Sequence, residues 1–424
     1  MHGDINLFTL SRNMHYGTIV VGGGIAGLSI ALQLAKDKQD VCILERYRMW
    51  GGRVATYRDP KNDIQYEIGA GRINTRHARI NNLVQRYGLH TFPMSVDKQF
   101  EHSYNAFNEL FAPIRAILQT LPNLGKHTIG ELVPHAYTPI LRMYPYWAEI
   151  YMLRADLALP LFEPQNTMGN KTSYYGISEG IDSITTHLAA DADREGAVLK
   201  NRHRVQDIQQ SIDGRFVIKG DFGKRKSAKP FAFTCDRVIL AISIDQLMNN
   251  LPTFSILQRT PLLKHLATSP LIRIYAVYPK TEDNMIWFAD LPEIVTNNPL
   301  RHVIPIDVDK GLIMISYTDG EDTVVWKDME GVALTNAIQN FLHALFPDSH
   351  IPMPTYLQKH VWNEGCTYWL PGDYDVVATS MAAHNPAKNV FICGESISLQ
   401  QTWMEGALQS ADTLYNLPAF RESF

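Results

Sequence analysis

The sequence has few cysteines, and none in a metal-binding arrangement. Its 424 residues contain four, Cys42, Cys235, Cys366 and Cys393, and no two of them form a C-x-x-C pair. Their scatter excludes the common cysteine-based zinc sites and a disulfide framework. We therefore expect no metal site and a reducing, cytoplasmic compartment.

A charge excess of one sign and a membrane segment are also missing. The 39 basic and 43 acidic residues give a net charge of −4, which leaves no footprint for nucleic acid or an anionic membrane. The N-terminus shows no basic segment followed by an apolar core, as a signal peptide would. Residues 16–35 are uncharged and long enough to cross a bilayer, but five glycines interrupt them. A strand, a loop and a helix of a soluble protein explain this segment better.

The residues that are present predict an α/β (α+β) fold. Hydrophobic residues make up 45% of the chain and charged residues 19%, which is typical of a globular protein with a large core. The run 19–21 predicts a buried parallel strand, a helix follows from Leu28, and 41–44 predicts the next strand. Residues 76–190 look mostly helical. Further predicted helices cover 80–87, 110–121, 334–345 and 404–414, and further strands cover 205–210, 216–219, 231–234, 238–241, 272–278, 312–317 and 390–393.

The loop between the first strand and helix matches the pattern G-x-G-x-x-G at Gly22, Gly24 and Gly27. In such a loop the first glycine allows the tight turn and the second lets the backbone approach a pyrophosphate. The third lets the helix pack on the strand. Because the pattern follows a predicted strand and opens a helix, it predicts a dinucleotide-binding site.

Further donors and acceptors surround this loop. The N–H groups at the helix N-terminus, including those of Ile25 and Ala26, would bind phosphates. Glu45, at the end of the next strand, would accept hydrogen bonds from the ribose hydroxyls. Gly52 and Arg53 follow shortly after it. A second glycine pair with an arginine suits a longer cofactor, so we expect FAD rather than NAD.

The run 20–53, which reads V-V-G-G-G-I-A-G-L, then L-E-R, then G-G-R, resembles the flavin-containing amine oxidase superfamily. Monoamine, polyamine and L-amino-acid oxidases belong to that superfamily. The resemblance continues at 66–72, 204–205, 236–241, and 391–395 together with 403–408, whereas the helical middle carries no matching motif. It implies that FAD contacts lie in the second glycine motif, an adenine-binding strand and a C-terminal signature, namely at Gly69, Ala70, Gly71, Arg72, Val205, Gly394, Glu395 and Met404.

The resemblance also implies a domain plan. A Rossmann-type FAD-binding domain would comprise residues 14–75, 195–246 and 385–424. It would be interleaved with a substrate-binding domain of mixed sheet plus helices, comprising 76–194 and 247–384. The helix N-terminus at Met404 would face the pyrimidine end of the flavin and stabilise negative charge there.

On the substrate side the resemblance implies an aromatic cage. Trp403 occupies the position of one wall, and Trp369 or Tyr368 is the candidate for the other. Aromatic walls would orient an amine and exclude water. Each of these residues could instead be an ordinary core aromatic.

Arg72 is the candidate that separates substrate classes. L-Amino-acid oxidases bind the substrate carboxylate with an arginine after a similar G-x-x-R stretch, which 69–72 matches. A guanidinium offers two parallel hydrogen bonds to a carboxylate. The alternative is a structural arginine that pairs with a neighbouring acid.

Two positions depart from the family pattern. Arg273 stands where the family usually has a lysine near flavin N5, which bears on reoxidation by oxygen. Gly365-Cys366 precedes a Leu-Pro-Gly run, as does the flavin-linked cysteine of monoamine oxidases, but the spacing is shorter. We therefore expect non-covalent FAD.

The resemblance implies a specific reaction. FAD would accept a hydride from the substrate Cα, giving an imine that hydrolyses to a carbonyl and ammonia, with O2 as electron acceptor and hydrogen peroxide as product. An L-α-amino acid is the first candidate substrate, and a monoamine or polyamine is the alternative. A desaturase acting on an apolar substrate, or a flavin-binding scaffold without turnover, stays possible. We expect no nucleic-acid or membrane partner, allow for a homodimer, and expect a soluble protein because no tail helix follows the last predicted helix.

Overall fold

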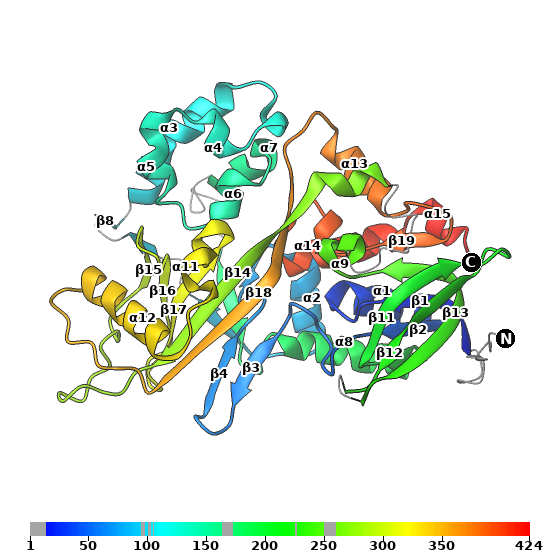
Figure 1. Ribbon diagram of the computed structural model, residues 1–424, viewed down its shortest axis with the longest axis horizontal. Helices are drawn as coiled ribbons and strands as arrows, with labels where there is room; N and C mark the ends of the chain where they lie inside the picture. Colours follow the sequence, from blue (N-terminus) through cyan, green and yellow to red (C-terminus); the bar gives the residue numbers. More distant parts are fainter. Residues whose placement is uncertain are drawn as a thin grey trace, which may run out of the picture.

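The structure is a computed structural model that describes residues 14–94, 98–100, 103–104, 106–162, 173–224, 227–249 and 260–424. Two large sheets lie side by side, and a group of short helices stands above the second of them (Figure 1). Within the described ranges no helix is both long and apolar enough to cross a membrane.

The first sheet has seven strands and a parallel centre. Their order is β10-β2-β1-β13-β12-β11, with β19 pairing on β13. β1, β2, β10, β13 and β19 run parallel, whereas β11 and β12 extend β13 as an antiparallel meander. The strands are β1 (Met14–Val21), β2 (Val41–Leu44), β10 (Val198–Lys200), β11 (His203–Gln210), β12 (Phe216–Phe222), β13 (Lys229–Leu240) and β19 (Val390–Ile392).

Side chains of this sheet alternate between two cores. Val20 and Ile43 join one core with five helices, whereas Ile19, Val21 and Cys42 join the other. The helices of the first core are α1 (Ile25–Lys36), α2 (Ala78–Arg86), α8 (Asp182–Arg194), α14 (Met404–Tyr415) and α15 (Pro418–Arg421). The second core is closed by α9 (Ile244–Asn249) and α13 (Val376–Ala383).

The second sheet is mostly antiparallel and has the order β18-β14-β17-β16-β15-β7-β8. On β14, Ile272, Ile274 and Ala276 face a core that includes α12 (Gly331–Leu345), so Leu271, Arg273 and Tyr275 face the opposite side. The strands are β7 (Lys98–Phe100), β8 (Ser103–Tyr104), β14 (Leu266–Val277), β15 (Glu293–Val295), β16 (His302–Asp307), β17 (Leu312–Asp319) and β18 (Tyr356–Trp369).

Two small sheets connect the large ones. The hairpin β3–β4 packs its tyrosines against β14, and β9 pairs with both β5 and β6. These strands are β3 (Thr56–Asp59), β4 (Ile64–Glu67), β5 (Ile73–Asn74), β6 (Thr91–Met94) and β9 (Tyr174–Ile177).

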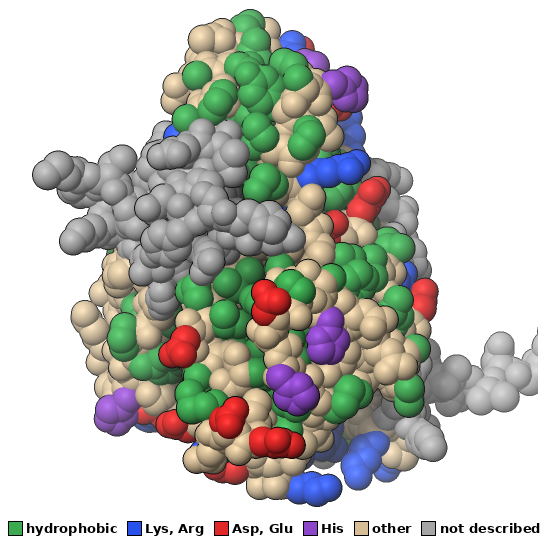
Figure 2. Space-filling view, turned by 90° about the vertical axis from the view of Figure 1, so that its left-hand side faces the viewer, with side chains coloured by type: hydrophobic (Ala, Val, Ile, Leu, Met, Phe, Trp, Pro, Cys, Tyr) green, Lys and Arg blue, Asp and Glu red, His purple; other side chains and the backbone are tan. Residues whose placement is uncertain are grey.

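The helical group has its own apolar core, to which Phe111, Leu141 and Ile150 belong. Figure 2 shows hydrophobic side chains gathered over this group at the top of the face, while charged ones are scattered below. The helices are α3 (Ala106–Thr120), α4 (Ile129–Leu132), α5 (Thr138–Leu141), α6 (Trp147–Tyr151) and α7 (Ala155–Ala158), and α11 (Val324–Lys327) lies elsewhere.

The α/β fold class is confirmed, but several element predictions need correction. The separate strands predicted at 231–234 and 238–241 form the single strand β13, because its pairing with β12 runs directly on into its pairing with β1. The mostly helical stretch 76–190 also contributes strands, among them β6 and β9. The sequence analysis missed β18, whose polar and aromatic residues lack a simple alternation.

The packing of two helices differs from the expected domain plan at its internal boundaries. The plan assigns α2 and α8 to the substrate-binding domain, yet both pack with α1 in one core. The boundaries therefore stay predictions, and these two helices belong to the first sheet by packing.

Candidate active site

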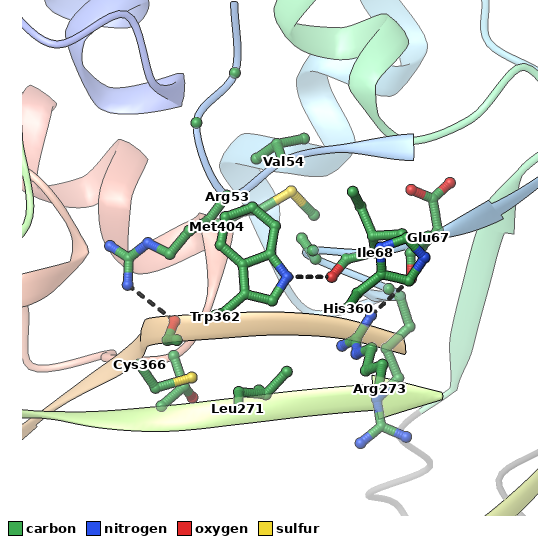
Figure 3. A pocket seen from close by; sticks show the side chains of 18 of the residues that line it. Arg53, Val54, Glu67, Ile68, Leu271, Arg273, His360, Trp362, Cys366 and Met404 are labelled. Atoms are coloured by element: carbon green, nitrogen blue, oxygen red, sulfur yellow. Dashed lines mark hydrogen bonds between the residues drawn. The ribbon is translucent and has the colours of Figure 1, made fainter. Parts of the chain in front are cut away.

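A large cavity of about 1810 Å³ runs between the two sheets. Segments far apart in sequence line it, including the loops after β1, β2 and β19, the N-terminus of α14 and the facing side of β14 and β18. Figure 3 shows part of this wall, with side chains from 53–68, 271–273 and 360–366 close together. The cavity is thus built where the sheets meet, and neither sheet forms it alone.

The loop from Gly22 to Gly27 has the geometry that its pattern predicts. Gly22 has φ of +107°, and a Cβ there would lie 2.4 Å from the carbonyl oxygen of Ala241. A Cβ on Gly27 would lie 2.0 Å from the carbonyl oxygen of Gly22, so only glycine lets α1 approach β1 this closely. Gly24 instead borders open space, because the nearest atom to its Cβ position is 3.9 Å away. The N-terminus of α1, with Ile25 and Ala26, opens onto the cavity.

Glu45 is fixed at one end of the cavity. Its carboxylate accepts hydrogen bonds from the backbone N–H groups of Gly23 and Tyr47, both at 2.8 Å. Burial raises the pKa of Glu45, and these two donors oppose the rise. Val205 on β11 lines the same part of the cavity, because His203 bonds to the Glu45 carbonyl. The residues expected to hold the ribose and adenine therefore lie together.

Arg53 and Glu395 form an ion pair beside the middle of the cavity. Arg53 Nη2 lies 2.9 Å from Glu395 Oε2, and its Nη1 donates to the carbonyl of Gly365 at 3.1 Å (Figure 3). The other Glu395 oxygen accepts from the backbone N–H groups of Thr367 and Thr402. The two residues expected near the pyrophosphate and ribityl thus neutralise each other.

Open space surrounds the expected position of the phosphates. A Cβ on Gly394 would meet nothing within 4 Å, and a Cβ on Gly52 would meet its nearest atom at 3.5 Å. Both residues line the cavity with Gly24. Three glycines around an empty volume beside a helix N-terminus fit a pyrophosphate, which approaches backbone rather than side chains.

The second glycine motif continues the wall toward the second sheet. Ala70 donates its N–H to the Arg53 carbonyl at 2.9 Å, which holds the motif against the ion pair. A Cβ on Gly69 would lie 1.9 Å from that carbonyl oxygen, and one on Gly71 would lie 3.1 Å from Arg273 Nη1. The motif therefore packs tightly on both sides.

Arg273 stands at the centre of a row across three strands. It pairs in register with His360 on β18 and Tyr317 on β17. Its Nη1 donates to the Glu67 carbonyl at 2.9 Å, and its guanidinium lies 4.8 Å from the Tyr317 ring centre (Figure 3). Trp362, the next residue on that face of β18, donates its indole N–H to the Ile68 carbonyl at 2.6 Å. The hydrogen bonds of Arg273 and Trp362 therefore hold β14 and β18 against the second glycine motif.

Arg72 lines the cavity, where its guanidinium contacts two tyrosines. Its Nη2 donates to the Tyr146 hydroxyl at 3.1 Å, and its guanidinium lies 4.6 Å from the ring centre of Tyr174. Burial opposes the charge, but the Tyr146 hydroxyl and the Glu293 carboxylate more than offset it and raise the pKa of Arg72. Among the described residues no carboxylate lies within ion-pair distance of Arg72.

The aromatic candidates separate by burial. Trp403 lines the cavity, parallel to Tyr174 with ring centres 6.1 Å apart. Tyr368 also lines it. Trp369 is fully buried in the core of the first sheet, where its indole N–H donates to the Ser398 carbonyl at 2.9 Å. Of the two candidates for the second wall, the geometry therefore leaves Tyr368.

Met404 begins α14 at the cavity, as expected, and no side chain caps this helix N-terminus. Glu405 turns away and accepts hydrogen bonds from the backbone N–H groups of Arg79 and Ile80 at the start of α2. The free N–H groups of α14 therefore face the cavity while its first acidic side chain does not.

Two further sequence expectations concern cysteine and metals. Cys366 lines the cavity, and its enclosed position raises the pKa of the thiol to about 12. Within the described part of the chain, no group of His, Cys, Asp or Glu side chains is arranged to hold a metal ion.

The sequence analysis missed several residues of the cavity wall. Glu293, His360 and Trp362 sit on strands or strand ends with no motif of their own, and only the pairing of the second sheet brings them to the cavity. The sequence analysis also missed Tyr146 and Tyr174 as wall residues. Neither belongs to a motif, although Tyr146 begins a stretch rich in aromatic residues.

Comparison with known proteins decides the family. The protein family described as "flavin containing amine oxidoreductase" matches this chain over residues 25–161 and 146–413. The chain belongs to this family. FAD is therefore the cofactor of the protein, and the protein is an oxidoreductase by membership.

Individual members of the family match shorter stretches. Flavin-containing amine oxidase A of Bos taurus is 29% identical over 144 residues, 30% of this chain and 27% of that protein. The L-amino-acid oxidase of Pseudechis australis is 41% identical over 71 residues, 17% of this chain and 14% of that protein. The chain thus covers well under two thirds of these relatives. A redesigned putrescine oxidase matches in structure, with a TM-score of 0.70 and 13% identity over 96% of this chain and 99% of that one, so it shows the fold.

Proposed function

We propose that this protein oxidises the α-amine of an L-α-amino acid, with O2 as acceptor and an imine and hydrogen peroxide as products. Arg72 carries this proposal, since it would hold a positive charge at the substrate side with no carboxylate of the described residues within ion-pair distance. A substrate carboxylate would supply that partner through two parallel hydrogen bonds. We expect the FAD to be bound non-covalently and the protein to act in the cytoplasm.

Each part of the wall has a task in this reaction. Bound FAD supplies the two-electron acceptor for a hydride from the substrate Cα. Trp403 and Tyr368 would flank the amine, orient its Cα and exclude water. Tyr146 and Tyr174 hold the Arg72 guanidinium in place, so little side-chain freedom is lost when it binds a carboxylate.

A diamine or polyamine is the second candidate, because carboxylates line the same cavity. The sequence alone showed no acidic cluster at the glycine motif, but Glu149, Glu293 and Asp319 all reach the cavity wall. Such groups would suit a substrate with a second cationic group. Monoamines are the remaining option within the family.

Anaerobic mixing of the FAD-loaded protein with L-amino acids, monoamines and polyamines tests the proposal by loss of flavin absorbance. We expect L-amino acids to bleach the flavin. Arg72→Ala should raise the substrate concentration for half-maximal bleaching by about 10–100-fold, which is the loss of a charge-assisted pair of roughly 1.5–3 kcal/mol. Arg76→Ala, an exposed neighbour, is the matched control.

Other outcomes redirect the assignment. Bleaching by amines alone, unaffected by Arg72→Ala, contradicts the carboxylate role and returns Arg72 to a structural one. Absence of bleaching with every compound contradicts amine oxidation and favours a desaturase or a flavin-binding scaffold.

A further inference from the structure

A chain of hydrogen bonds leads from the Arg273 row toward the outside of the protein. His360 Nε2 lies 3.0 Å from the hydroxyl of Tyr66, and that hydroxyl lies 2.9 Å from the hydroxyl of Tyr356. His360 and Tyr66 line the cavity. None of these three residues has a part in binding the substrate or FAD as described above.

The middle of this chain is closed to water. Tyr66 is 3% exposed, and its ring stacks between Tyr57 and Tyr275 with ring centres 5.0 and 3.8 Å away. Burial also raises the pKa of Tyr66 far above its usual range, so its hydroxyl stays neutral. A proton can pass it only if one proton arrives at the oxygen as another leaves.

The outer end of the chain reaches polar surroundings. Tyr356 is half-buried at the start of β18. Burial raises the pKa of Tyr356 to about 12, and Tyr57 and the Asp59 carboxylate add to the rise. Asp59 is the end of β3 and also lines the cavity. Because Tyr356 is partly exposed, solvent and a carboxylate are both within reach where the chain ends.

The inner end of the chain lies in the cavity wall beside Arg273. His360 is the register partner of Arg273. Its ring contacts Tyr57 on β3, Tyr66 on β4 and Tyr275 on β14. Burial and the Arg273 charge lower the pKa of His360 to about 4, which keeps the imidazole neutral with one N–H. Its Nδ1 has no hydrogen-bond partner among the described residues.

We infer that His360, Tyr66 and Tyr356 form a proton relay between the cavity and solvent. The inference rests on the proposed function, in which an ammonium substrate must lose a proton before it can give up a hydride. Overall, the ammonium substrate and O2 give an iminium ion and hydrogen peroxide. The substrate loses one hydrogen from Cα and one from nitrogen, O2 gains both, and the net charge is unchanged. One proton therefore leaves the cavity in the first half of the cycle and returns in the second.

The relay moves that proton in three coupled transfers. The imidazole accepts a proton at Nδ1 while its Nε2–H bond breaks and an O–H bond forms on Tyr66. The former Tyr66 proton forms a bond to the Tyr356 oxygen, and the former Tyr356 proton goes to water near Asp59. His360 is left neutral in its other tautomer, and the returning proton reverses each step.

Proton exchange at His360 tests the relay without depending on turnover. In the FAD-loaded protein with 15N-labelled histidine, the His360 signal is assigned by its loss in His360→Gln. Tyr356→Phe interrupts the relay beyond Tyr66, so we expect exchange of the Nε2 proton with solvent to slow at least tenfold. A purely structural loosening would speed the exchange instead. Tyr278→Phe is the matched control, since that buried hydroxyl has no partner among the described residues and lies on the other face of the second sheet.

Kinetics supply the second measurement. Flavin bleaching by a substrate amine should slow about tenfold in Tyr66→Phe, which is below the ~10²–10⁴-fold typical of full acid–base catalysis because cavity water can replace part of the path. The solvent isotope effect on bleaching should change in Tyr66→Phe and Tyr356→Phe and stay constant in Tyr278→Phe.

The two hypotheses fail separately. Unchanged proton exchange in Tyr356→Phe, with a protein of unaltered melting temperature, overturns the relay whatever the substrate. If the unmodified protein oxidises no amine, the proposed function falls, and the exchange measurement alone decides whether the proton path exists.

Discussion

At the scale of single residues, glycines around the cavity serve two separable purposes. Gly27 is required by the fold, because its Cβ would overlap the Gly22 carbonyl. Gly24 faces the cavity, and its φ of −72° and ψ of 177° suit any L-residue. Two neighbouring members of one motif can therefore be tested against each other.

Gly24→Ala should fold normally and bind FAD poorly. Its stability without FAD should stay equal or rise by about 0.5 kcal/mol, since alanine restricts the unfolded chain. FAD affinity should fall about 10–100-fold, the equivalent of one lost hydrogen bond to a charged group of roughly 1.5–3 kcal/mol. Titration by flavin fluorescence and thermal unfolding measure both.

Gly27→Ala is the opposite control. We expect a loss of stability of about 1–3 kcal/mol, as for overpacking of a core, whether or not FAD is present. Equal FAD affinity in Gly24→Ala and the unmodified protein would contradict the position given to the phosphates.

Cys366 makes the flavin linkage testable. A thiol whose pKa lies at about 12 is almost entirely protonated at neutral pH, and the protonated form is a poor nucleophile. We expect denaturation to release all FAD into solution, with Cys366→Ser unchanged. Flavin that stays with the denatured chain, and is lost in Cys366→Ser, would demonstrate a covalent bond.

Residue identity could be predicted better than residue position. The glycine loop, Glu45 and Arg53 could be recognised in the sequence, because the backbone geometry of a dinucleotide site requires those residue types in that order. Tyr368 and Trp369 are adjacent aromatics on one strand, and only the pleat decides which faces the cavity. His360 carries no local signal at all.

At the scale of elements, Asp319 joins the end of β17 to the start of α6. Its carboxylate accepts from the backbone N–H groups of Trp147 and Ala148 at 2.8 and 2.9 Å. Burial nevertheless raises the pKa of Asp319 to about 6, against these two donors. The native state therefore holds a proton that the unfolded chain would release.

The stability of the protein should fall as pH rises from about 4 to 6 through this one group. A raised native pKa means that the native state binds more protons in that window, so the stabilising effect is present below pH 4 and lost above pH 6. The difference in unfolding free energy between the protein and Asp319→Asn should change by up to about 3 kcal/mol across the window. Denaturant unfolding at several pH values measures it, and a flat difference would contradict the raised pKa.

Elements with local periodicity were predictable, and those held by long-range pairing were not. The βαβ opening, α12 and α14 follow from apolar spacing in the sequence. β18 was missed because its 14 residues mix charged, polar and aromatic types, and what keeps it extended is its pairing along the whole of β14. β13 was divided in two because Asp236 and Arg237 interrupt its apolar run, although the ladder continues through them.

At the scale of the whole molecule, the cavity is the interface between the two sheets. Its lining reaches from residue 21 to residue 407 and draws on nearly every part of the chain between them. We expect a cofactor in this position to contact both halves, so that its binding energy would stabilise the whole fold.

FAD should therefore stabilise both halves together. At 100 times its dissociation constant, a ligand that binds only the native state adds about 2.7 kcal/mol. We expect hydrogen exchange to slow on FAD addition in the loop 22–27 and equally in segments 360–366 and 394–404. Protection confined to the first of these would show that FAD contacts the first sheet alone, and Gly24→Ala should weaken all three effects.

Arg273 has one consequence for how the protein meets changes in acidity. A lysine at such a place can shed its charge when buried, whereas a guanidinium keeps it throughout the range in which proteins stay folded. Its bond to the Glu67 carbonyl and its position over Tyr317 also leave it no second place to go. The positive electrostatic potential at that point of the wall is thus fixed by the type of residue, and the surroundings cannot remove it by shifting a pKa.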